Sequence, residues 1–420
     1  MPDTAAVRVT DAAGLRDALT GQPAPAQVYV GGFANHPAEL ARALVDMAGS
    51  ASRTTASVSI PAGLPTPLKS WGGRVVLTHS IDGFEDAIAA GRAAFRPVHL
   101  SELAAQLRAH RPRVTFLRVA PPDRDGRCHL GFSVDTTLDA VHGGELVVAE
   151  FDPSLPRAAG DCWIPADQIF LGVEAAPLPP RQVSRTAASP AETQIACRVA
   201  ELIPDGATVE LGMGRVPDVI ADGLHDHRDL RLHTGIVTSS VVRLLGAGAV
   251  DESPSPLFLA PVAAIMGTND ADVRAALSTD PRIELHPAST THDRRFLGAL
   301  PDFHAVNGAL GVALDGSVNC EFSGTRRVAA VGGLMDFREG ARQSPGGKFV
   351  VALTSTTSSG ASRIVPALHR PATVPAADAG WVVTEFGAID LGPLDSSERA
   401  AALIELAHPA HRDALASARP

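Results

Sequence analysis

The feature that most constrains the fold is the alternation of short valine-rich apolar runs with stretches whose apolar residues recur at helical spacing. Residues 37–49 carry such a helical pattern, and strand candidates surround it at 26–32, 55–60, 73–80, 113–120 and 144–151. Near-continuous apolar strands separated by helices are typical of parallel sheets that helices cover on both faces. We therefore predict an α/β protein with mainly parallel sheets.

The chain is too long for one domain to be the natural expectation. It has 420 residues, and single hydrophobic cores rarely grow beyond about 250–300 residues. Residues 174–193 are rich in Pro, Ser and Ala and form the best linker candidate. A helical pattern follows at 192–203, and further strand candidates lie at 205–214, 230–235, 255–263, 304–314, 348–355 and 379–387. We predict one domain over residues 1–185 and a second over 186–420.

The composition excludes several classes of binding partner. The net charge is −10 and no Lys/Arg block is present, which argues against nucleic acid or an anionic membrane as a partner. No stretch approaches about 18 uninterrupted apolar residues, so no membrane span is expected. The four cysteines lie far apart without a CxxC pair, so neither a disulfide framework nor a metal site is expected. The first residues lack a signal-peptide pattern, and we expect a cytoplasmic protein.

A glycine-rich turn offers the first chemical motif. The sequence LGMGRVPD at 211–218, which contains Gly214, joins a strand candidate to a helix candidate. Such a turn can direct backbone N–H groups at an anion, although glycine turns connect strands and helices in every α/β protein. Ordered motifs follow it: DLRLHTG at 229–235, VALDGSVNCEFSG at 312–324, VGGLMDF at 331–337, GGK at 346–348, SRIVP at 362–366 and VVTEFGAIDL at 382–391.

This series closely resembles the acetyl-CoA hydrolase and acetate-type CoA-transferase family. Residues 116–137 and 147–164 resemble its first domain, so the likeness covers most of the chain. It implies two Rossmann-like α/β domains with the active site in the cleft between them, and a homo-oligomer, often a dimer. It also implies acyl-CoA and a small carboxylic acid as substrates, with no permanently bound cofactor. The family reacts through a glutamate that forms a mixed anhydride and then a glutamyl-CoA thioester.

The chain departs from the family where that glutamate is expected. The glutamate follows the His-Thr of the family's strand end, whereas here His233 and Thr234 precede Gly235. Glycine has no side chain and cannot form an anhydride. The usual downstream Ser-Asp-Gly is also changed, to Thr238-Ser239-Ser240. His292 falls where the family has an asparagine, and it could donate a hydrogen bond or act as a general base. It could equally be an exposed loop histidine.

Other site positions are retained. The resemblance assigns the backbone N–H groups of Gly332 and Gly333 to an oxyanion hole, and Glu385 to the site as an acid or base. It assigns the CoA moiety to Gly346, Gly347, Lys348, Ser362 and Arg363. The expected substrate pocket contains Gly214, His233, Gly235, Cys320 and Glu321. Cys320 could replace the nucleophile or be a small core thiol, and Glu321 could be a replacement carboxylate.

Three functions are consistent with these residues. The first is an enzyme that processes acyl-CoA by direct attack of water or a substrate nucleophile, giving a free acid, an ester, an amide or a ring, in a specialised biosynthetic pathway. The second is a CoA-transferase that uses another carboxylate, Glu321 or Glu385. The third is a non-catalytic protein that retains the CoA cleft.

Overall fold

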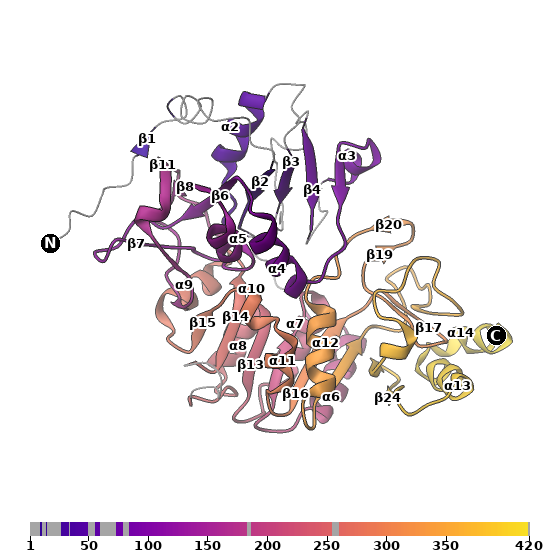
Figure 1. The fold of residues 1–420 in the computed structure, drawn as a ribbon. Coiled ribbons are helices and arrows are strands. Elements are labelled where there is room, and N and C mark those ends of the chain that lie inside the picture. Colours follow the sequence, from indigo (N-terminus) through magenta and orange to yellow (C-terminus); the bar gives the residue numbers. More distant parts are fainter. Residues whose placement is uncertain are drawn as a thin grey trace. The chain divides into compact units, whose positions relative to one another are not determined.

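The computed structural model describes residues 9–10, 14, 27–32, 34–48, 55–58, 73–78, 84–182, 186–253 and 260–418. The chain forms two compact units, each built from two segments (Figure 1). Unit 1 comprises Met1–Gln182 and Ala264–Thr291, and unit 2 comprises Val183–Ala263 and His292–Pro420. The domain boundary at 185/186 stays a prediction. The exchange of residues 264–291 into unit 1 is a feature that the sequence did not indicate.

Unit 1 contains an eight-stranded parallel sheet in the order β1-β11-β8-β6-β2-β3-β4-β5. The strands are β1 (Val9–Thr10), β2 (Gln27–Val30), β3 (Thr55–Val58), β4 (Arg74–Leu77), β5 (Ala93–Phe95), β6 (Val114–Val119), β8 (Leu146–Phe151) and β11 (Ile169–Glu174). Every residue of β6 is buried, as expected for a parallel strand that is covered on both faces. Its helices are α2 (Ala38–Ala48), α3 (Glu85–Ala89), α4 (Leu100–His110), α5 (Thr137–Gly143), α9 (Ala271–Thr279) and α10 (Ala288–Thr291).

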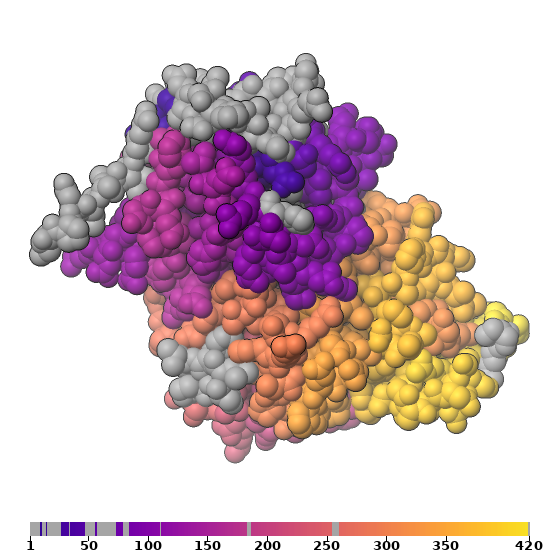
Figure 2. Space-filling view, viewed as in Figure 1, coloured from indigo at the N-terminus to yellow at the C-terminus, as the bar shows by residue number. Residues whose placement is uncertain are grey.

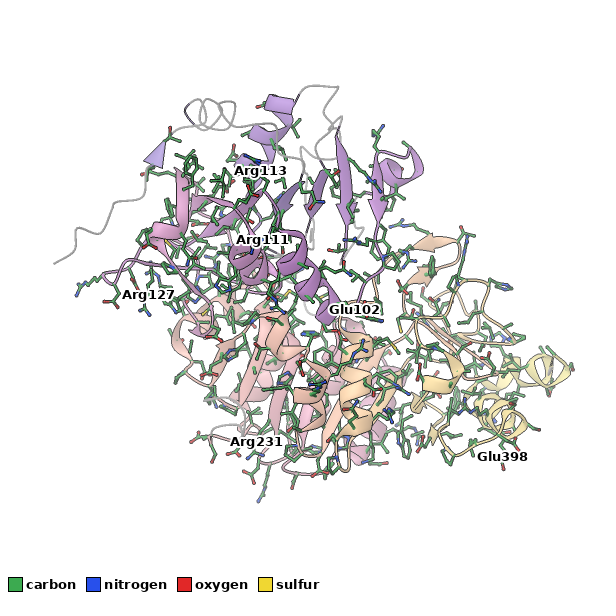
Figure 3. All side chains as sticks on the ribbon, in the orientation of Figure 1. Glu102, Arg111, Arg113, Arg127, Arg231 and Glu398 are labelled. Atoms are coloured by element: carbon green, nitrogen blue, oxygen red, sulfur yellow. The ribbon has the colours of Figure 1, made fainter. Side chains whose placement is uncertain are left out.

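Smaller elements complete unit 1. An antiparallel pair joins β7 (Arg127–His129) to β10 (Trp163–Pro165), and a parallel pair joins β9 (Ala159–Gly160) to β15 (Ile283–Leu285). A short 3-10 helix, η2, spans Ala166–Gln168. Arg127 lies over the ring of Trp163 at 4.9 Å from its centroid, and the Arg127 side chain projects from the unit (Figure 3). The strand β14 (Val262–Gly267) begins in unit 2 and ends in unit 1.

Unit 2 is built around strands in the order β24-β23-β21-β16-β12-β13. They are β12 (Thr208–Leu211), β13 (Arg231–Val237), β16 (Phe303–Gly308), β21 (Lys348–Ala352), β23 (Trp381–Thr384) and β24 (Gly387–Asp390). All pairs from β13 to β23 are parallel, and only the β23–β24 pair among these six is antiparallel. The predicted fold class, α/β with mainly parallel sheets, is confirmed in both units.

The helices of this unit are α6 (Pro190–Leu202), α7 (Arg215–Gly223), α8 (Ser239–Gly246), α11 (Arg294–Gly298), α12 (Leu334–Gln343), α13 (Ser396–Leu406) and α14 (Pro409–Ser417). Ser189 with Glu192 caps α6, and Asp395 with Glu398 (Figure 3) caps α13, each in a reciprocal capping box. The yellow surface in Figure 2 belongs to the C-terminal segment that ends in α13 and α14. A 3-10 helix, η3, spans Ala376–Asp378.

One strand prediction in this unit is wrong. The run 304–314 was expected as a single strand, but it forms β16 and then β17 (Gly311–Ala313), which belongs to a separate sheet in the order β18-β17-β22. Its other strands are β18 (Val318–Asn319) and β22 (Ile364–Val365), and a small hairpin pairs β19 (Phe322–Ser323) with β20 (Arg326–Arg327). The break falls at Gly308–Leu310, where glycine weakens strand continuity.

Candidate active site

Several of the motifs of unit 2 lie at one edge of its sheet. Parallel strands present their carboxyl ends together, and ligands of open α/β sheets bind outside that edge. β12 runs into the glycine turn 212–214, β16 ends at Asn307 and Gly308, and β23 is followed by Glu385. Gly214 caps α7 with φ +129°, a backbone conformation that favours glycine.

Gly235 lies in β13 beside an aromatic side chain of α12. A Cβ added at Gly235 would meet only Cε2 of Phe337 within 4 Å, at 3.7 Å, which is ordinary van der Waals contact. The His292 ring lies 4.5 Å from the Phe337 ring, centroid to centroid. His233 is also buried, and its ring contacts Phe296, Phe303 and Phe337. Gly235, His233 and His292 are therefore brought together around Phe337.

Gly333 joins this cluster from the start of α12. A Cβ added at Gly333 would lie 2.3 Å from Nε2 of His292 and 3.2 Å from Cε2 of Phe337, so the His292 ring rests directly on the glycine. Gly332 has φ +54° and open space at its Cβ position. Within the described part of the chain, neither N–H group of these two glycines donates to another group. His292 lies in the turn between α10 and α11 but is 0% exposed, so the alternative of an exposed loop histidine is wrong.

The changed segment Thr238–Ser240 forms a local hydrogen-bond chain. The hydroxyls of Thr238 and Ser240 are 2.7 Å apart, and Ser240 Oγ donates to Asp218 Oδ1 at 2.6 Å. This chain connects the first turn of α8 to the first turn of α7, which begins after the glycine turn. Thr238 and Ser240 thus have a structural role at the carboxyl edge of the sheet. At the other end of β13, Arg231 (Figure 3) pairs with Asp251 at 2.6 Å.

Glu385 follows β23 and is held by one residue. Its Oε2 accepts from the Ser355 backbone N–H at 2.9 Å, and its Oε1 accepts from Ser355 Oγ at 2.6 Å. The strand order places β23 four strand positions from β13. With neighbouring strands about 4.8 Å apart, the backbones of these strands are separated by about 19 Å. The structure does not bring Glu385 together with Gly235.

The residues expected to bind CoA fall at two opposite edges of the sheet. Gly346, Gly347 and Lys348 precede or begin β21, at its amino end. There Gly346 has φ +78°, and a Cβ added to Gly347 would lie 2.3 Å from the Ala341 carbonyl oxygen. Lys348 Nζ donates to the Leu202 carbonyl at 3.1 Å. These contacts give the three residues a structural role, and their binding of CoA stays a prediction that this geometry weakens.

Ser362 and Arg363 lie instead near Ser355 at the carboxyl edge. The Arg363 backbone N–H donates to the Ser355 carbonyl at 2.8 Å, and its guanidinium donates to the Leu310 carbonyl at 3.1 Å. Ser362 Oγ donates to the Ile364 carbonyl. Arg363 makes no ion pair with a described carboxylate, and burial lowers its pKa. A half-buried guanidinium of this kind suits a phosphate group of CoA.

Cys320 and Glu321 lie outside the main sheet, beyond β18. Burial, with a smaller effect of neighbouring Glu321, raises the pKa of the Cys320 thiol to about 12. Glu321 is paired with Arg327 and also accepts from Thr373 Oγ1 at 3.2 Å. A protonated thiol is a poor nucleophile, and a carboxylate engaged on both oxygens is less available for attack.

We expect Cys320→Ala to change acyl-CoA turnover by no more than about twofold, because the thiol is protonated at neutral pH. Iodoacetamide at neutral pH, followed by peptide mapping, should label exposed Cys197 and spare Cys320. A large loss of turnover in a normally folded Cys320→Ala variant, with rapid labelling of Cys320 in the wild-type chain, would show that the thiol reacts.

The structure adds three polar residues that sequence reasoning missed: Glu210, Asn307 and Ser355. Glu210 is 2% exposed in the middle of β12, and its Oε2 accepts from Asn307 Nδ2 at 2.7 Å. Burial raises its pKa to about 8, against the lowering effect of hydrogen bonds from Asn307 and the Val306 backbone. The available signal was a glutamate within the otherwise apolar strand TVEL, because charged residues are rarely fully buried.

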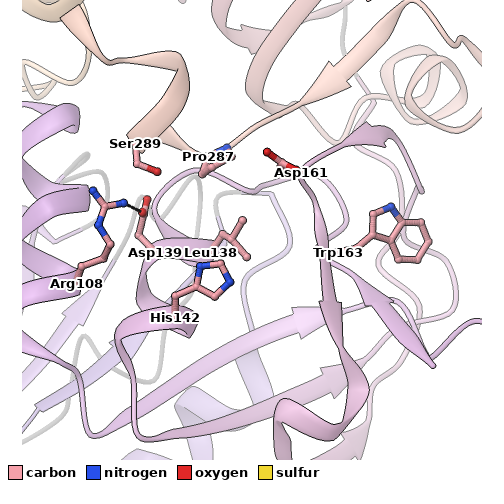
Figure 4. Close-up of a pocket in the computed structure, with 8 residues that line it drawn as sticks. All are labelled: Arg108, Leu138, Asp139, His142, Asp161, Trp163, Pro287 and Ser289. Atoms are coloured by element: carbon pink, nitrogen blue, oxygen red, sulfur yellow. Dashed lines mark hydrogen bonds and ion pairs between the residues drawn. The ribbon is translucent and has the colours of Figure 1, made fainter. Parts of the chain in front are cut away.

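A separate pocket of about 360 Å³ lies within unit 1 (Figure 4). Its walls mix charges of both signs with apolar side chains: Arg108, Leu138, Asp139, His142, Asp161, Trp163, Pro287 and Ser289. None of these residues belongs to the predicted site. Within the described ranges, no three His, Cys, Asp or Glu side chains are arranged to hold a metal ion, and no helix has the length and apolar character needed to cross a membrane.

Comparison with known proteins identifies the scaffold. The acetyl-CoA hydrolase/transferase N-terminal domain matches residues 74–186, and the C-terminal domain of the same family matches residues 270–419. The 4-hydroxybutyrate coenzyme A transferase of Clostridium kluyveri is 31% identical over 337 residues, which is 79% of this chain and 78% of that protein. The chain belongs to the acetyl-CoA hydrolase/transferase family. It is a CoA-transferase-like enzyme.

Other members of this family confirm the breadth of the match. The succinyl-CoA:cyclohexane-1-carboxylate CoA transferase of Geobacter metallireducens is 31% identical, covering 79% of this chain and 77% of that protein. Among solved structures, RipA from Yersinia pestis superimposes with a TM-score of 0.89 at 27% identity, over 98% of this chain and 96% of RipA. A 4-hydroxybutyrate CoA-transferase from Porphyromonas gingivalis gives a TM-score of 0.78 at 25% identity, with the same coverage.

Proposed function

We propose that this family member processes an acyl-CoA thioester by direct attack of water or a substrate nucleophile, without a glutamyl-CoA intermediate. The observation that carries the proposal is Gly235. Where the family resemblance expects a nucleophilic carboxylate, β13 presents a glycine whose side-chain space opens towards Phe337, on which the His292 ring packs. A missing carboxylate leaves room for a nucleophile that comes from solution or from the substrate.

The neighbouring groups suit this chemistry. The N–H groups of Gly332 and Gly333 would donate to the oxyanion of the tetrahedral intermediate. His292, whose Nε2 faces Gly333, would accept the proton of the attacking water or hydroxyl. The new bond forms at the carbonyl carbon, and the C–S bond then breaks with release of the CoA thiolate. The products are CoA and a free acid, or CoA and the acylated acceptor.

The geometry favours His292 over Glu385 as the base. Glu385 follows a strand about 19 Å from β13 and is engaged by Ser355. Arg363, at the same edge as Ser355, is a candidate for the CoA phosphates. The acceptor is proposed to be a small carboxylic acid or another nucleophile, in a specialised biosynthetic reaction. Assembly into a homodimer remains an expectation from the family.

Two alternatives stay open. A CoA-transferase that uses Glu321 or Glu385 would form a covalent enzyme–CoA adduct, although both carboxylates are already held by neighbouring groups. A non-catalytic CoA-binding protein would bind acyl-CoA without turning it over. The two unengaged N–H groups at Gly332 and Gly333 favour an enzyme over this second alternative.

Covalent trapping separates these functions. During turnover of short-chain acyl-CoA thioesters, borohydride or hydroxylamine followed by peptide mass mapping should give no modified glutamate in the wild-type chain. The Gly235→Glu variant should give a modified residue 235, because its Cβ has ordinary space and the N–H groups of Gly332 and Gly333 are retained. Gly235→Gln is the matched control, since it has nearly the same size and cannot form the anhydride.

An adduct on Glu321 or Glu385 in the wild-type chain would contradict the proposed function and establish the transferase alternative. Acyl-CoA binding by calorimetry, with no turnover across a broad acyl panel, would establish the non-catalytic alternative.

A further inference from the structure

Glu210 is a buried carboxyl group that the proposed reaction does not use. It lies in β12, the strand between β13, which carries Gly235, and β16, which carries Asn307. No described cation lies within ion-pair distance of its carboxylate, and its hydrogen bonds come from Asn307 and the Val306 backbone. Burying a carboxyl group without a cation is unfavourable, so its presence in an apolar strand requires an explanation.

The partner of Glu210 lies against the glycine turn. Because Asn307 Nδ2 donates to Glu210, the other side of the amide, Oδ1, is directed at Gly212, where an added Cβ would lie only 2.6 Å from it. A side chain at position 212 would therefore displace the Asn307 amide. Asn307 is 8% exposed at the carboxyl end of β16, beside the turn that contains Gly214.

We propose that Glu210 is a positioning residue of the acyl-CoA site: it fixes the Asn307 amide against the turn 212–214. The inference rests on the proposed function, since the turn is part of the site expected to receive acyl-CoA. Asn307 is the group that meets the ligand, and Glu210 acts through it. In its neutral form, Glu210 adds no negative charge beneath a site whose ligand and oxyanion are both anionic.

The titration of Glu210 is governed by its own surroundings. Burial is the dominant cause of its raised pKa, and no charged neighbour contributes. The elements that pack against β12 carry the following charged or titratable groups: Arg231 and His233 on β13, His304 on β16, and Arg215, Asp218 and Asp222 on α7. On α12, which carries Phe337, Asp336 is paired with Arg294 of α11 at 2.9 Å. Ionisation of Glu210 above pH about 8 would place a negative charge beside Asn307.

The test compares pH profiles of three variants on the acyl-CoA that the wild-type chain turns over fastest. The wild-type kcat/KM should fall as pH rises through about 8. Glu210→Gln retains an acceptor for Asn307, so it should keep most of the neutral-pH activity and lose the alkaline decline. Glu210→Met removes the acceptor and should lower kcat/KM by roughly tenfold or more at every pH. Thr208→Val, a buried polar-to-apolar change two residues earlier in β12, is the matched control and should keep the wild-type profile.

Two further measurements separate this proposal from the proposed function. Infrared difference spectra of the folded protein at neutral pH should show a protonated carboxyl band that titrates near pH 8 and disappears in Glu210→Gln. Calorimetry with CoA should show affinity that weakens above the same pH in the wild-type chain but not in this variant. If the wild-type chain binds CoA with this pH dependence but turns nothing over, the proposed function fails and the role of Glu210 stands.

Three results would overturn the role of Glu210. They are an unchanged alkaline decline in Glu210→Gln, the absence of the carboxyl band from the wild-type spectrum, and wild-type activity in Glu210→Met. A wild-type chain that neither binds CoA nor turns over any thioester would overturn this role together with the proposed function.

Discussion

Replacing Gly333 with alanine should lower acyl-CoA turnover by roughly 100-fold or more, because a displacement of about 1 Å in a catalytic group can have an effect of this size. The new Cβ would lie 2.3 Å from Nε2 and 2.4 Å from Cδ2 of His292. His292 is fully buried and its ring packs on Phe337, so the ring has little freedom to move aside. Either His292 or the turn that carries the two glycine N–H groups must shift.

The matched control for this change is Gly332→Ala. The Cβ of residue 332 would meet no atom within 4 Å, although its φ of +54° is strained for alanine, which costs about 1–2 kcal/mol. We expect Gly332→Ala to lower stability slightly and to retain far more turnover than Gly333→Ala. Steady-state kinetics together with thermal unfolding would separate the two effects. Equal losses of turnover in both variants would show that contact with His292 is not the cause.

The fold could be predicted because its signal is local. The strands that the sequence indicated, such as β6 and β21, are short and apolar, and burial on both faces requires that pattern of a parallel sheet. The return of residues 264–291 to unit 1 has no such local signal, because it depends on which strands become neighbours. The end of β16 is the opposite case, because Gly308 is a local signal in the sequence for the end of that strand.

Some positions in the candidate site could likewise be predicted from the sequence, whereas others depend on the order of the strands. A residue just after a strand lies at the carboxyl edge and a residue just before one lies at the amino edge. The positions of Gly214 and Lys348 at opposite edges could therefore have been derived from the sequence. The distance between Gly235 and Glu385 could not, because it follows from the strand order β23-β21-β16-β12-β13. Three strands lie between the strands of Gly235 and Glu385, so these residues do not share one reacting atom.

Phe337→Ala should lower the free energy of unfolding of unit 2 by about 3–5 kcal/mol, the range for removal of a buried phenylalanine. Phe337 is 3% exposed, and its ring contacts His233, His292 and Phe303. Removing the ring leaves a cavity between α12 and β13 that the surrounding helix and sheet cannot fill completely. Because the chain has two units, the change is best followed by hydrogen exchange of the α12 and β13 peptides during urea unfolding.

Two further variants make this prediction specific. Phe386→Ala removes a phenylalanine that is 37% exposed in the same unit, and it should change the same free energy by about 1 kcal/mol or less. Gly235→Leu places a side chain on the neighbouring strand, where the nearest atom to its Cβ belongs to Phe337. In the Phe337→Ala background that leucine should fill part of the cavity and restore stability, whereas alone it should crowd the ring.

A coupling free energy between positions 235 and 337 would therefore be expected from the double-mutant cycle, on the order of 1 kcal/mol or more for residues in contact. This coupling does not depend on activity, substrate or acyl group. It tests directly whether the side-chain space at Gly235 faces Phe337, which is the geometric premise of the proposal that a nucleophile from solution or substrate occupies that space. Additive effects of the two substitutions would place Gly235 elsewhere and remove that premise, whatever the kinetics of the wild-type chain.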